Sequence, residues 1–103
     1  LLTDKKQKES GVTTIDIAKT LIEYGMHPMT IYFPLVVSGA MLIEPTETES
    51  KDMLDRFIAV MKMIAKTAQG EKIESLQGNP VSAPRRRLDE VGAARNPRLK
   101  WCE

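Results

Sequence analysis

The sequence predicts a small α+β domain, with a short antiparallel sheet, helices on one face of it, and an extended tail. Two segments with apolar residues at helical spacing enclose two short segments rich in β-branched and aromatic residues. A chain of 103 residues allows one domain of this kind. After Gly70 the apolar periodicity stops and prolines become frequent. The predicted division is therefore a leader or truncated strand over 1–12, a helix-strand-strand-helix domain over 13–70, and a tail over 71–103.

The first helix is expected over about Thr14–Tyr24. Thr13 and Asp16 have the spacing of a capping box, with Asp in place of the usual Glu. Gly25 suits the left-handed residue that follows many helix ends, and Pro28 prevents the helix from continuing. Local chemistry thus predicts both ends of this helix.

Two short strands are expected next, over Thr30–Phe33 and Ala40–Glu44. Pro34 ends the first strand or places it at a sheet edge, and a turn at Ser38 and Gly39 joins the two. The short connection predicts an antiparallel pair. The leader "LLTDKKQKES" does not show the hydrophobic strand that would complete the sheet ahead of the first helix.

The second helix has the most regular pattern, and we expect it over about Glu49–Ala68, ending at a C-cap on Gly70. Its charged residues fall mostly on the face opposite the apolar one. The methionines in it are interpreted as core filling; they are Met53, Met61 and Met63. In the tail, the sequence leaves room for a short helix over 88–95.

The acidic stretch before this helix has two interpretations. Thr46 and Glu49 have capping-box spacing, and carboxylates in a first helical turn interact favourably with the helix dipole. A metal or acid/base site would need oxygen ligands that converge on one point, and Glu44, Glu47 and Glu49 match no such spacing. The cap is the favoured interpretation.

The other reactive residue types stand alone. His27, the only histidine, lies in a turn and is interpreted as a surface hydrogen-bonding residue rather than a general base or phosphate ligand. Tyr24 and Tyr32 are expected in the core or an interface. For Arg85–Arg87, an interface or solvated tail is favoured over a nucleic-acid patch, which would need interleaved aromatic residues. Cys102 is expected to be inert.

Neither the net charge nor the hydropathy of the chain indicates a nucleic-acid or membrane partner. The formal net charge of +1 requires neither nucleic acid nor an anionic membrane as a partner. The longest apolar run, Met29–Ile43, is broken by Pro34 and Gly39 and falls short of the ~20 residues that span a bilayer. The single cysteine fits a reducing compartment. The residues alone support a small module without a catalytic constellation.

Several segments resemble one enzyme family. "DIAKTLIEYGMHP", "TIYFP", "MLIEPTETESKDMLDRF" and "RRLDEVGAARNPRLKW" are similar to the C-terminal part of glycine dehydrogenase (decarboxylating), the P-protein of the glycine cleavage system. The resemblance is best to subunit 2 of the two-subunit bacterial form and covers about residues 11–101. The phrase "IEPTETES" is its most specific part.

The resemblance implies a fold and a parent activity. Members of the family are cytoplasmic pyridoxal-phosphate enzymes of the aspartate-aminotransferase-like fold (PLP fold type I), and this chain would be their small C-terminal domain. The parent decarboxylates glycine and transfers the aminomethyl group to the lipoyl arm of H-protein. The resemblance also implies assembly with subunit 1 and with a second copy of subunit 2.

The chain departs from the family at the cofactor segment. A His-Lys pair in a threonine- and glycine-rich setting is absent, because His27 is followed by Pro28 and none of the lysines has that context. We therefore expect no catalytic, cofactor-binding or metal-binding residue here, and a fragment inactive by itself. His27, Thr46 and Glu47 are candidates for lining the cleft of the intact enzyme. The alternative hypothesis is a stand-alone interaction or regulatory module without catalysis.

Overall fold

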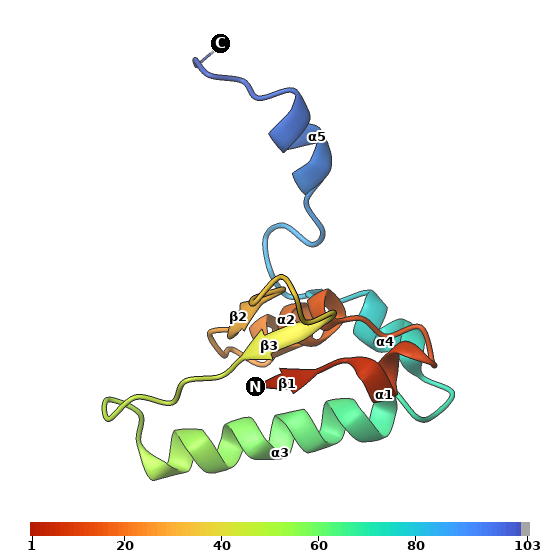
Figure 1. Cartoon of the computed structure of the whole chain (residues 1–103), viewed down its shortest axis with the longest axis vertical. Coiled ribbons are helices and arrows are strands. Elements are labelled where there is room, and N and C mark those ends of the chain that lie inside the picture. The colour runs from red at the N-terminus through yellow and green to blue at the C-terminus, as the bar shows by residue number, and fades with distance from the viewer. Residues whose placement is uncertain (102–103) are drawn as a thin grey trace.

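A three-stranded antiparallel sheet, with β3 between β1 and β2, organises the chain (Figure 1). The computed structural model describes residues 1–101, so the prediction for Cys102 lies outside the described residues. The elements run in the order β1 Leu2–Thr3, α1 Lys5–Lys8, α2 Thr14–Glu23, β2 Thr30–Ile31, β3 Ala40–Leu42, α3 Lys51–Thr67, α4 Ile73–Gln77 and α5 Glu90–Arg95. The predicted α+β class is confirmed.

The sheet contains the predicted antiparallel pair and one further strand near the N-terminus. β2 and β3 pair antiparallel with Ile31 opposite Met41, as predicted. β1 also pairs antiparallel with β3, with Leu2 opposite Met41; the sequence leaves residues 1–12 as a leader or a truncated strand and shows no hydrophobic strand pattern there. β1 has only two residues, Leu2 and Thr3, which is too short for the alternating pattern that predicts a strand. It is a strand because the fold places β3 beside it.

Helix α2 forms where its caps predict. The backbone N–H and the hydroxyl of Thr13 donate to Asp16 Oδ2 at 2.9 and 2.7 Å. Gly25 has φ +72°, which is the left-handed conformation expected after the last turn. Its N–H donates to the Ile22 carbonyl at 2.9 Å and that of Met26 to the Leu21 carbonyl at 2.9 Å. These bonds satisfy carbonyls that the helix end leaves without partners.

Helix α3 forms as predicted, but with different caps. Ser50 is the N-cap, and its hydroxyl accepts from the Met53 N–H at 3.2 Å. The cap predicted at Thr46 is therefore wrong; the Thr46 hydroxyl instead shares a 2.7 Å hydrogen bond with the Thr48 hydroxyl. The C-cap is Ala68 in a right-handed conformation, so Gly70 does not have the predicted role.

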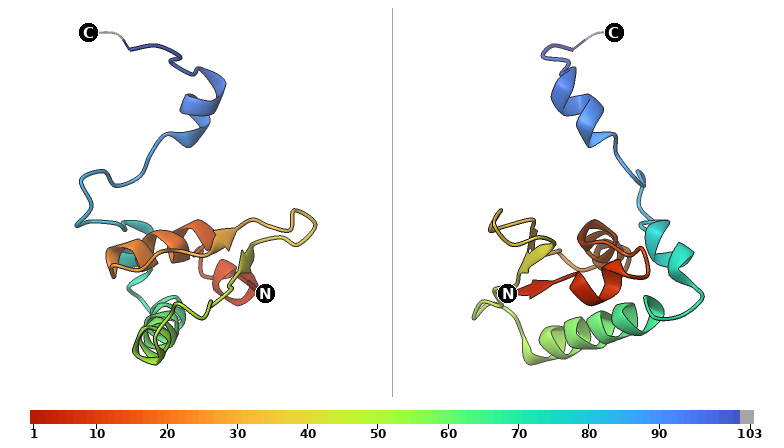
Figure 2. Two further views of the ribbon diagram at one scale, coloured as in Figure 1. Left: turned by 90° about the vertical axis from the view of Figure 1, so that its left-hand side faces the viewer. Right: turned by 45° about the vertical axis from the view of Figure 1, so that its right-hand side comes forward.

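The core lies between the sheet, α2, α3 and α4. Its centre includes Leu21 of α2, Met41 of β3, Ile64 of α3 and Leu76 of α4, each at most 2% exposed. Figure 2 shows α2 and α3 as separate helical rods on either side of the N-terminal segment. Burial of these side chains, each worth about 1.5–3 kcal/mol, is the main stabilisation of the fold.

The tail contains two helices rather than one. Helix α4 was not anticipated, whereas α5 falls within the span left for a short helix. All views place α5 away from the sheet and the other helices (Figures 1 and 2). Within residues 1–101, no helix is long and apolar enough to cross a membrane.

Candidate functional site

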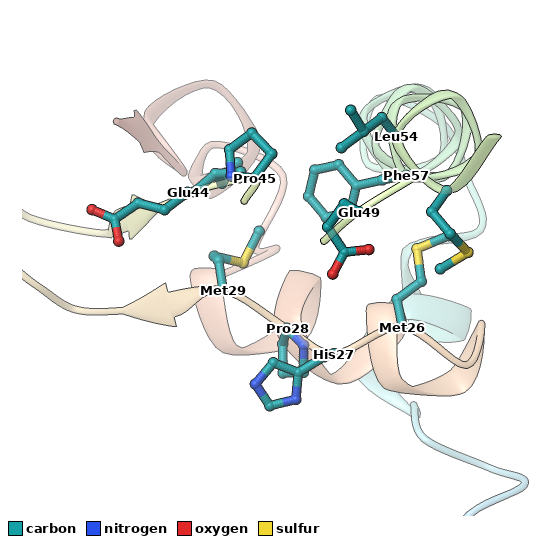
Figure 3. Close-up of a pocket in the computed structure, with 11 residues that line it drawn as sticks. Met26, His27, Pro28, Met29, Glu44, Pro45, Glu49, Leu54 and Phe57 are labelled. Carbon is teal, nitrogen blue, oxygen red and sulfur yellow. The ribbon is translucent and has the colours of Figure 1, made fainter. Parts of the chain in front are cut away.

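A hollow of about 260 Å³ lies where α2 ends, β3 ends and α3 begins (Figure 3). Its walls are formed by the turn after α2, the chain that leaves β3 and the first turns of α3. The lining residues are Met26, His27, Pro28, Met29, Ile43, Glu44, Pro45, Glu49, Met53, Leu54 and Phe57. Its surface is therefore largely apolar and rich in methionine.

Local sequence chemistry positions this hollow. Gly25 lets the chain leave α2 in a left-handed turn, which turns Met26 inward until it is 6% exposed. The Ser50 cap begins α3, and Phe57 reaches the hollow two helical turns later. The hollow thus depends on two helix ends and on the core beneath them.

The polar groups of the hollow are few. Figure 3 shows the Glu49 carboxylate pointing into the space between Phe57 and Pro28, while the Glu44 carboxylate points away from it. The His27 imidazole lies at the margin and is exposed. Among residues 1–101, no group of three or more histidine, cysteine, aspartate or glutamate side chains is placed to hold a metal ion. The arrangement can bind an apolar group with a positive charge beside it.

The three cleft candidates do not come together. His27 lines the hollow, whereas Thr46 and Glu47 are exposed on the loop that leads from β3 to α3 and are absent from its lining. Their role in the cleft of a larger enzyme stays a prediction. Residues that sequence reasoning did not select for this hollow include Met26, Met29 and Phe57.

The residues present do not fit pyridoxal phosphate. A Schiff-base lysine requires a desolvated setting or a nearby cation that lowers its amine pKa. Every lysine in residues 1–101 is exposed except Lys19, whose Nζ lies 4.0 Å from Glu90 Oε1. No lysine lines the hollow. The described residues thus supply no candidate for a cofactor amine.

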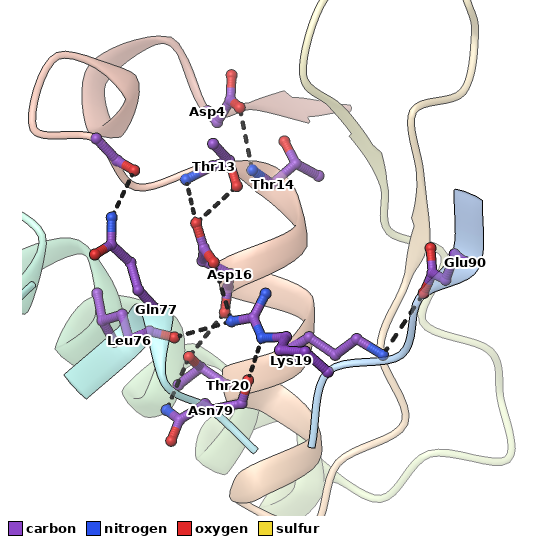
Figure 4. Close-up of polar contacts among 12 residues, drawn as sticks. Asp4, Thr13, Thr14, Asp16, Lys19, Thr20, Leu76, Gln77, Asn79 and Glu90 are labelled. Carbon is purple, nitrogen blue, oxygen red and sulfur yellow. Dashed lines mark hydrogen bonds and ion pairs between the residues drawn. The ribbon is translucent and has the colours of Figure 1, made fainter. Parts of the chain in front are cut away.

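A second feature of α2 is a polar latch, which we define as Asp16, Thr20 and Glu23 of α2 with Asn79, Ser82 and Arg87 of the tail. Figure 4 shows the part of it around Asp16, Thr20 and Asn79. Arg87 Nη2 lies 3.0 Å from Asp16 Oδ1, and Arg87 Nε donates to the Asn79 carbonyl at 2.6 Å. Asn79 Nδ2 donates to the Thr20 hydroxyl at 3.1 Å. The latch fixes the start of the tail along α2.

At Glu23, the last residue of α2, one carboxylate oxygen accepts three hydrogen bonds. Its Oε2 accepts from the Val81 N–H at 2.6 Å, the Ser82 N–H at 2.9 Å and the Ser82 hydroxyl at 3.0 Å. These contacts lower the pKa of Glu23 below its ordinary 4.5, and the hydrogen bond from the Ser82 N–H is the largest cause. The Val81 N–H, the Ser82 hydroxyl and the charge of Arg86 lower the pKa further, whereas desolvation raises it. Hydrogen bonds to the charged form explain this direction.

Sequence reasoning treated Arg85–Arg87 as one cluster, but the structure separates its members. Arg87 donates hydrogen bonds to the body, including one from Nη2 to the Leu76 carbonyl at 3.3 Å. Arg86, which precedes it, acts on Glu23 through its charge. No signal in the tail alone distinguishes Arg87, because its partners come from α2 and α4. It is an intramolecular contact residue.

Comparison with known protein sequences shows which family the chain resembles. A sequence profile described as "Glycine dehydrogenase, C-terminal domain" matches residues 1–84. Proteins named probable glycine dehydrogenase (decarboxylating) subunit 2 are similar to the chain at 58% identity in Caulobacter vibrioides, 54% in Caldanaerobacter subterraneus subsp. tengcongensis and 50% in Kosmotoga olearia. The matches cover 98%, 94% and 94% of this chain but 19%, 20% and 20% of the relatives. The chain therefore spans about one fifth of the length of these relatives.

Proposed function

The chain belongs to the glycine dehydrogenase C-terminal domain family, and from this we propose that it serves as the small C-terminal domain of a glycine dehydrogenase (decarboxylating) subunit 2. In this proposal the domain has the aspartate-aminotransferase-like architecture and helps to close the active-site cleft. The observation that carries the proposal is the match over nearly the whole chain to the same fifth of several relatives.

The proposal assigns the chemistry to the parent enzyme. Pyridoxal phosphate there would act as the electron sink for glycine decarboxylation, and the aminomethyl group would pass to the lipoyl arm of H-protein. The lysines of this chain do not fit the role of the cofactor amine, because they are exposed or, for Lys19, close to Glu90. Subunit 1, a second copy of subunit 2 and a cytoplasmic location belong to the same proposal.

An exposed apolar loop supports a docking role toward the rest of the parent. The segment 32–39 joins β2 to β3 and carries Leu35 and Val36 at 87% and 93% exposure. Phe33 beside them is 55% exposed. An apolar tip of this kind is typical of a surface that another domain or subunit covers.

A chimera tests the function. The 103 residues replace the matching segment of the Caulobacter vibrioides relative, and glycine–bicarbonate exchange is measured in the presence of subunit 1, pyridoxal phosphate and H-protein. We expect exchange from the chimera and from the intact relative, and none from a version that ends before the segment. Full activity in that shortened version, or exchange by the isolated chain, would contradict the proposal.

A paired variant tests the docking loop. Leu35→Asp with Val36→Asp in the chimera is expected to lower exchange about tenfold or more, because two charges would enter an apolar interface. The matched control is Glu71→Lys, an exposed position in the connection between α3 and α4. Equal activities of the two would remove the loop from the interface.

A further inference from the structure

A groove of about 700 Å³ lies between the N-terminal segment and α3, where β1 and α1 run alongside that helix (Figures 1 and 2). Met41 and Ile64 lie at its base, each at most 2% exposed. Leu2 and Ile58 line it from β1 and α3 and are 48% and 49% exposed. Large apolar side chains that are half-covered along a groove are typical of a surface that another segment covers.

Lysines stand around this groove. Lys5 and Lys6 of α1 and Lys62 of α3 are among its lining residues, and all three are exposed. Within residues 1–101, no acidic residue lines the groove and none of the three lysines forms an ion pair. A segment that fills the groove should therefore combine apolar side chains with carboxylates at its margin.

The groove also borders a free edge of the sheet. β1 is an outer strand, with β3 on one side and, among the described residues, no strand on the other. Leu2 and Thr3 of β1 line the groove. Open strand edges are normally paired or covered in folded proteins, because their backbone N–H and C=O groups attract other strands. One covering segment would satisfy both the strand edge and the apolar groove.

We propose that this segment belongs to the polypeptide that precedes Leu1 in an intact subunit 2, and that it places apolar side chains on Ile58 and carboxylates beside Lys62. The inference rests on the part of the proposed function that makes this chain the C-terminal domain of such a subunit. The chain matches a C-terminal domain profile and spans about one fifth of its relatives, so most of such a subunit precedes it. Leu1 itself lines the groove, so the preceding residues begin beside it.

Two physical reasons favour this occupant over a second copy of the chain. A segment tethered by a short connection has an effective concentration of about millimolar, which a second copy would have to reach in solution. A two-fold contact at this groove would also bring the same three lysines of both copies together, and like charges repel across an interface. Carboxylates of the preceding polypeptide would instead neutralise these lysines.

Acetylation of lysine amines by acetic anhydride measures whether the groove is covered. The rates at Lys62 and Lys72 are compared by mass spectrometry between the 103-residue chain and the chimera with the Caulobacter vibrioides relative. We expect the rate at Lys62 to fall about tenfold or more in the chimera, because a covered amine reacts only when the groove opens. Lys72 is an exposed control in the connection between α3 and α4, and its rate should stay within about twofold.

Zero-length cross-linking with a carbodiimide identifies the occupant, because the reagent joins an amine to a carboxylate in direct contact with it. We expect products that link Lys5, Lys6 or Lys62 to an aspartate or glutamate ahead of Leu1 in the same polypeptide. A mixture of heavy-nitrogen and unlabelled chimera separates links within one copy from links between two copies. Links from these lysines only to a second copy or to subunit 1 would overturn the proposal.

A pair of variants on α3 tests the apolar contact. Ile58→Gln places an amide in the groove, whereas Ala59→Gln places the same side chain at the next residue, which is exposed and outside the lining. In the chimera, Ile58→Gln should raise the acetylation rate of Lys62 about fivefold or more, because an amide buried without a hydrogen-bond partner favours the open groove. Ala59→Gln should retain the protection. Equal protection in the two variants would contradict the contact.

The covered groove and the proposed function fail in different measurements. Glycine–bicarbonate exchange by the chimera tests the proposed function, and acetylation of Lys62 is read whether or not exchange occurs. Equal rates at Lys62 in an active chimera and in the 103-residue chain would overturn the covered groove and leave the proposed function standing. Protection of Lys62 with cross-links to the preceding polypeptide in a chimera without exchange would support the groove contact and count against the activity.

Discussion

Gly39 is a turn residue whose backbone carbonyl bonds to two other segments of the fold. It has φ +65°, and its carbonyl accepts from the Thr14 hydroxyl at 2.8 Å and from the Asp4 N–H at 3.2 Å. The Asp4 carboxylate is buried at 5% exposure and accepts from the Thr14 N–H at 3.1 Å. One turn residue therefore joins β1, the start of α2 and β3.

Gly39→Ala is expected to lower the free energy of unfolding by about 2–3 kcal/mol, measured by urea denaturation. A Cβ at this position would overlap the Asp4 carboxylate, and the left-handed backbone adds strain. The control is Gly70→Ala, where the nearest contact of a new Cβ is 3.7 Å and φ is not positive. Equal losses at the two glycines would contradict this account.

The Glu23 carboxylate predicts acid sensitivity of the latch. Because its pKa in the folded state is lowered from 4.5, its contribution to stability is present above 4.5 and is lost as the pH falls through the folded value. We expect amide protons of Val81 and Ser82 to exchange faster below pH 4.5, relative to core amides. Glu23→Gln should flatten this dependence, while Glu71→Gln should not. Identical pH profiles for both variants would argue against the latch.

Helix α3 shows what periodicity can and cannot establish. Its apolar residues divide between a buried side, with Val60 at 8% and Ile64 at 1% exposure, and an exposed side, with Ile58 at 49%. Sequence periodicity placed Ile58 and Ile64 in one apolar stripe and left Val60 out of it. Only the packing of α2, α4 and β3 decides which part of that wide stripe is covered.

Ile64→Ala and Ile58→Ala on the same helix test this division. The first should lower the free energy of unfolding by about 2–5 kcal/mol, because it opens a cavity in the core, and the second by less than about 1 kcal/mol. Both changes replace the same side chain with the same helix former, so helix propensity cancels in the comparison. Thermal or urea unfolding provides the measurement, and similar losses would place the core elsewhere.

At the scale of the whole molecule, the chain divides at the latch into a packed body and a C-terminal segment, residues 88–101, which includes α5. The body ends where Arg87 contacts Asp16 and Asn79. Beyond it, Glu90 of α5 forms a 4.0 Å ion pair with Lys19 of α2, and this pair is partly exposed. Exposed ion pairs contribute little to stability, so this pair holds α5 only weakly.

Limited trypsin digestion of dilute, monomeric chain should therefore cleave first after Arg95 and Arg98. Cleavage after Arg87 should be at least about tenfold slower, because that bond lies beside a formed network and must open first. Mass spectrometry of the early fragments gives the order. Arg87→Lys keeps a trypsin site without the planar fork of donors, and should make that bond more sensitive. First cleavage within residues 51–67 would contradict this division.

The sequence by itself determined the α+β class, both ends of α2, the existence of α3, the antiparallel pairing of β2 with β3, and the family. These depend on periodicity, cap and turn chemistry within a few residues, and on motif identity. Tertiary structure alone decided the pairing of β1, the cap at Ser50, the hollow and the latch. At the latch, the Val81 N–H bonds to Glu23, which lies 58 positions earlier in the chain, and Asn79 bonds to Thr20, which lies 59 positions earlier. Such contacts form because the fold brings distant segments together, and no local pattern encodes them.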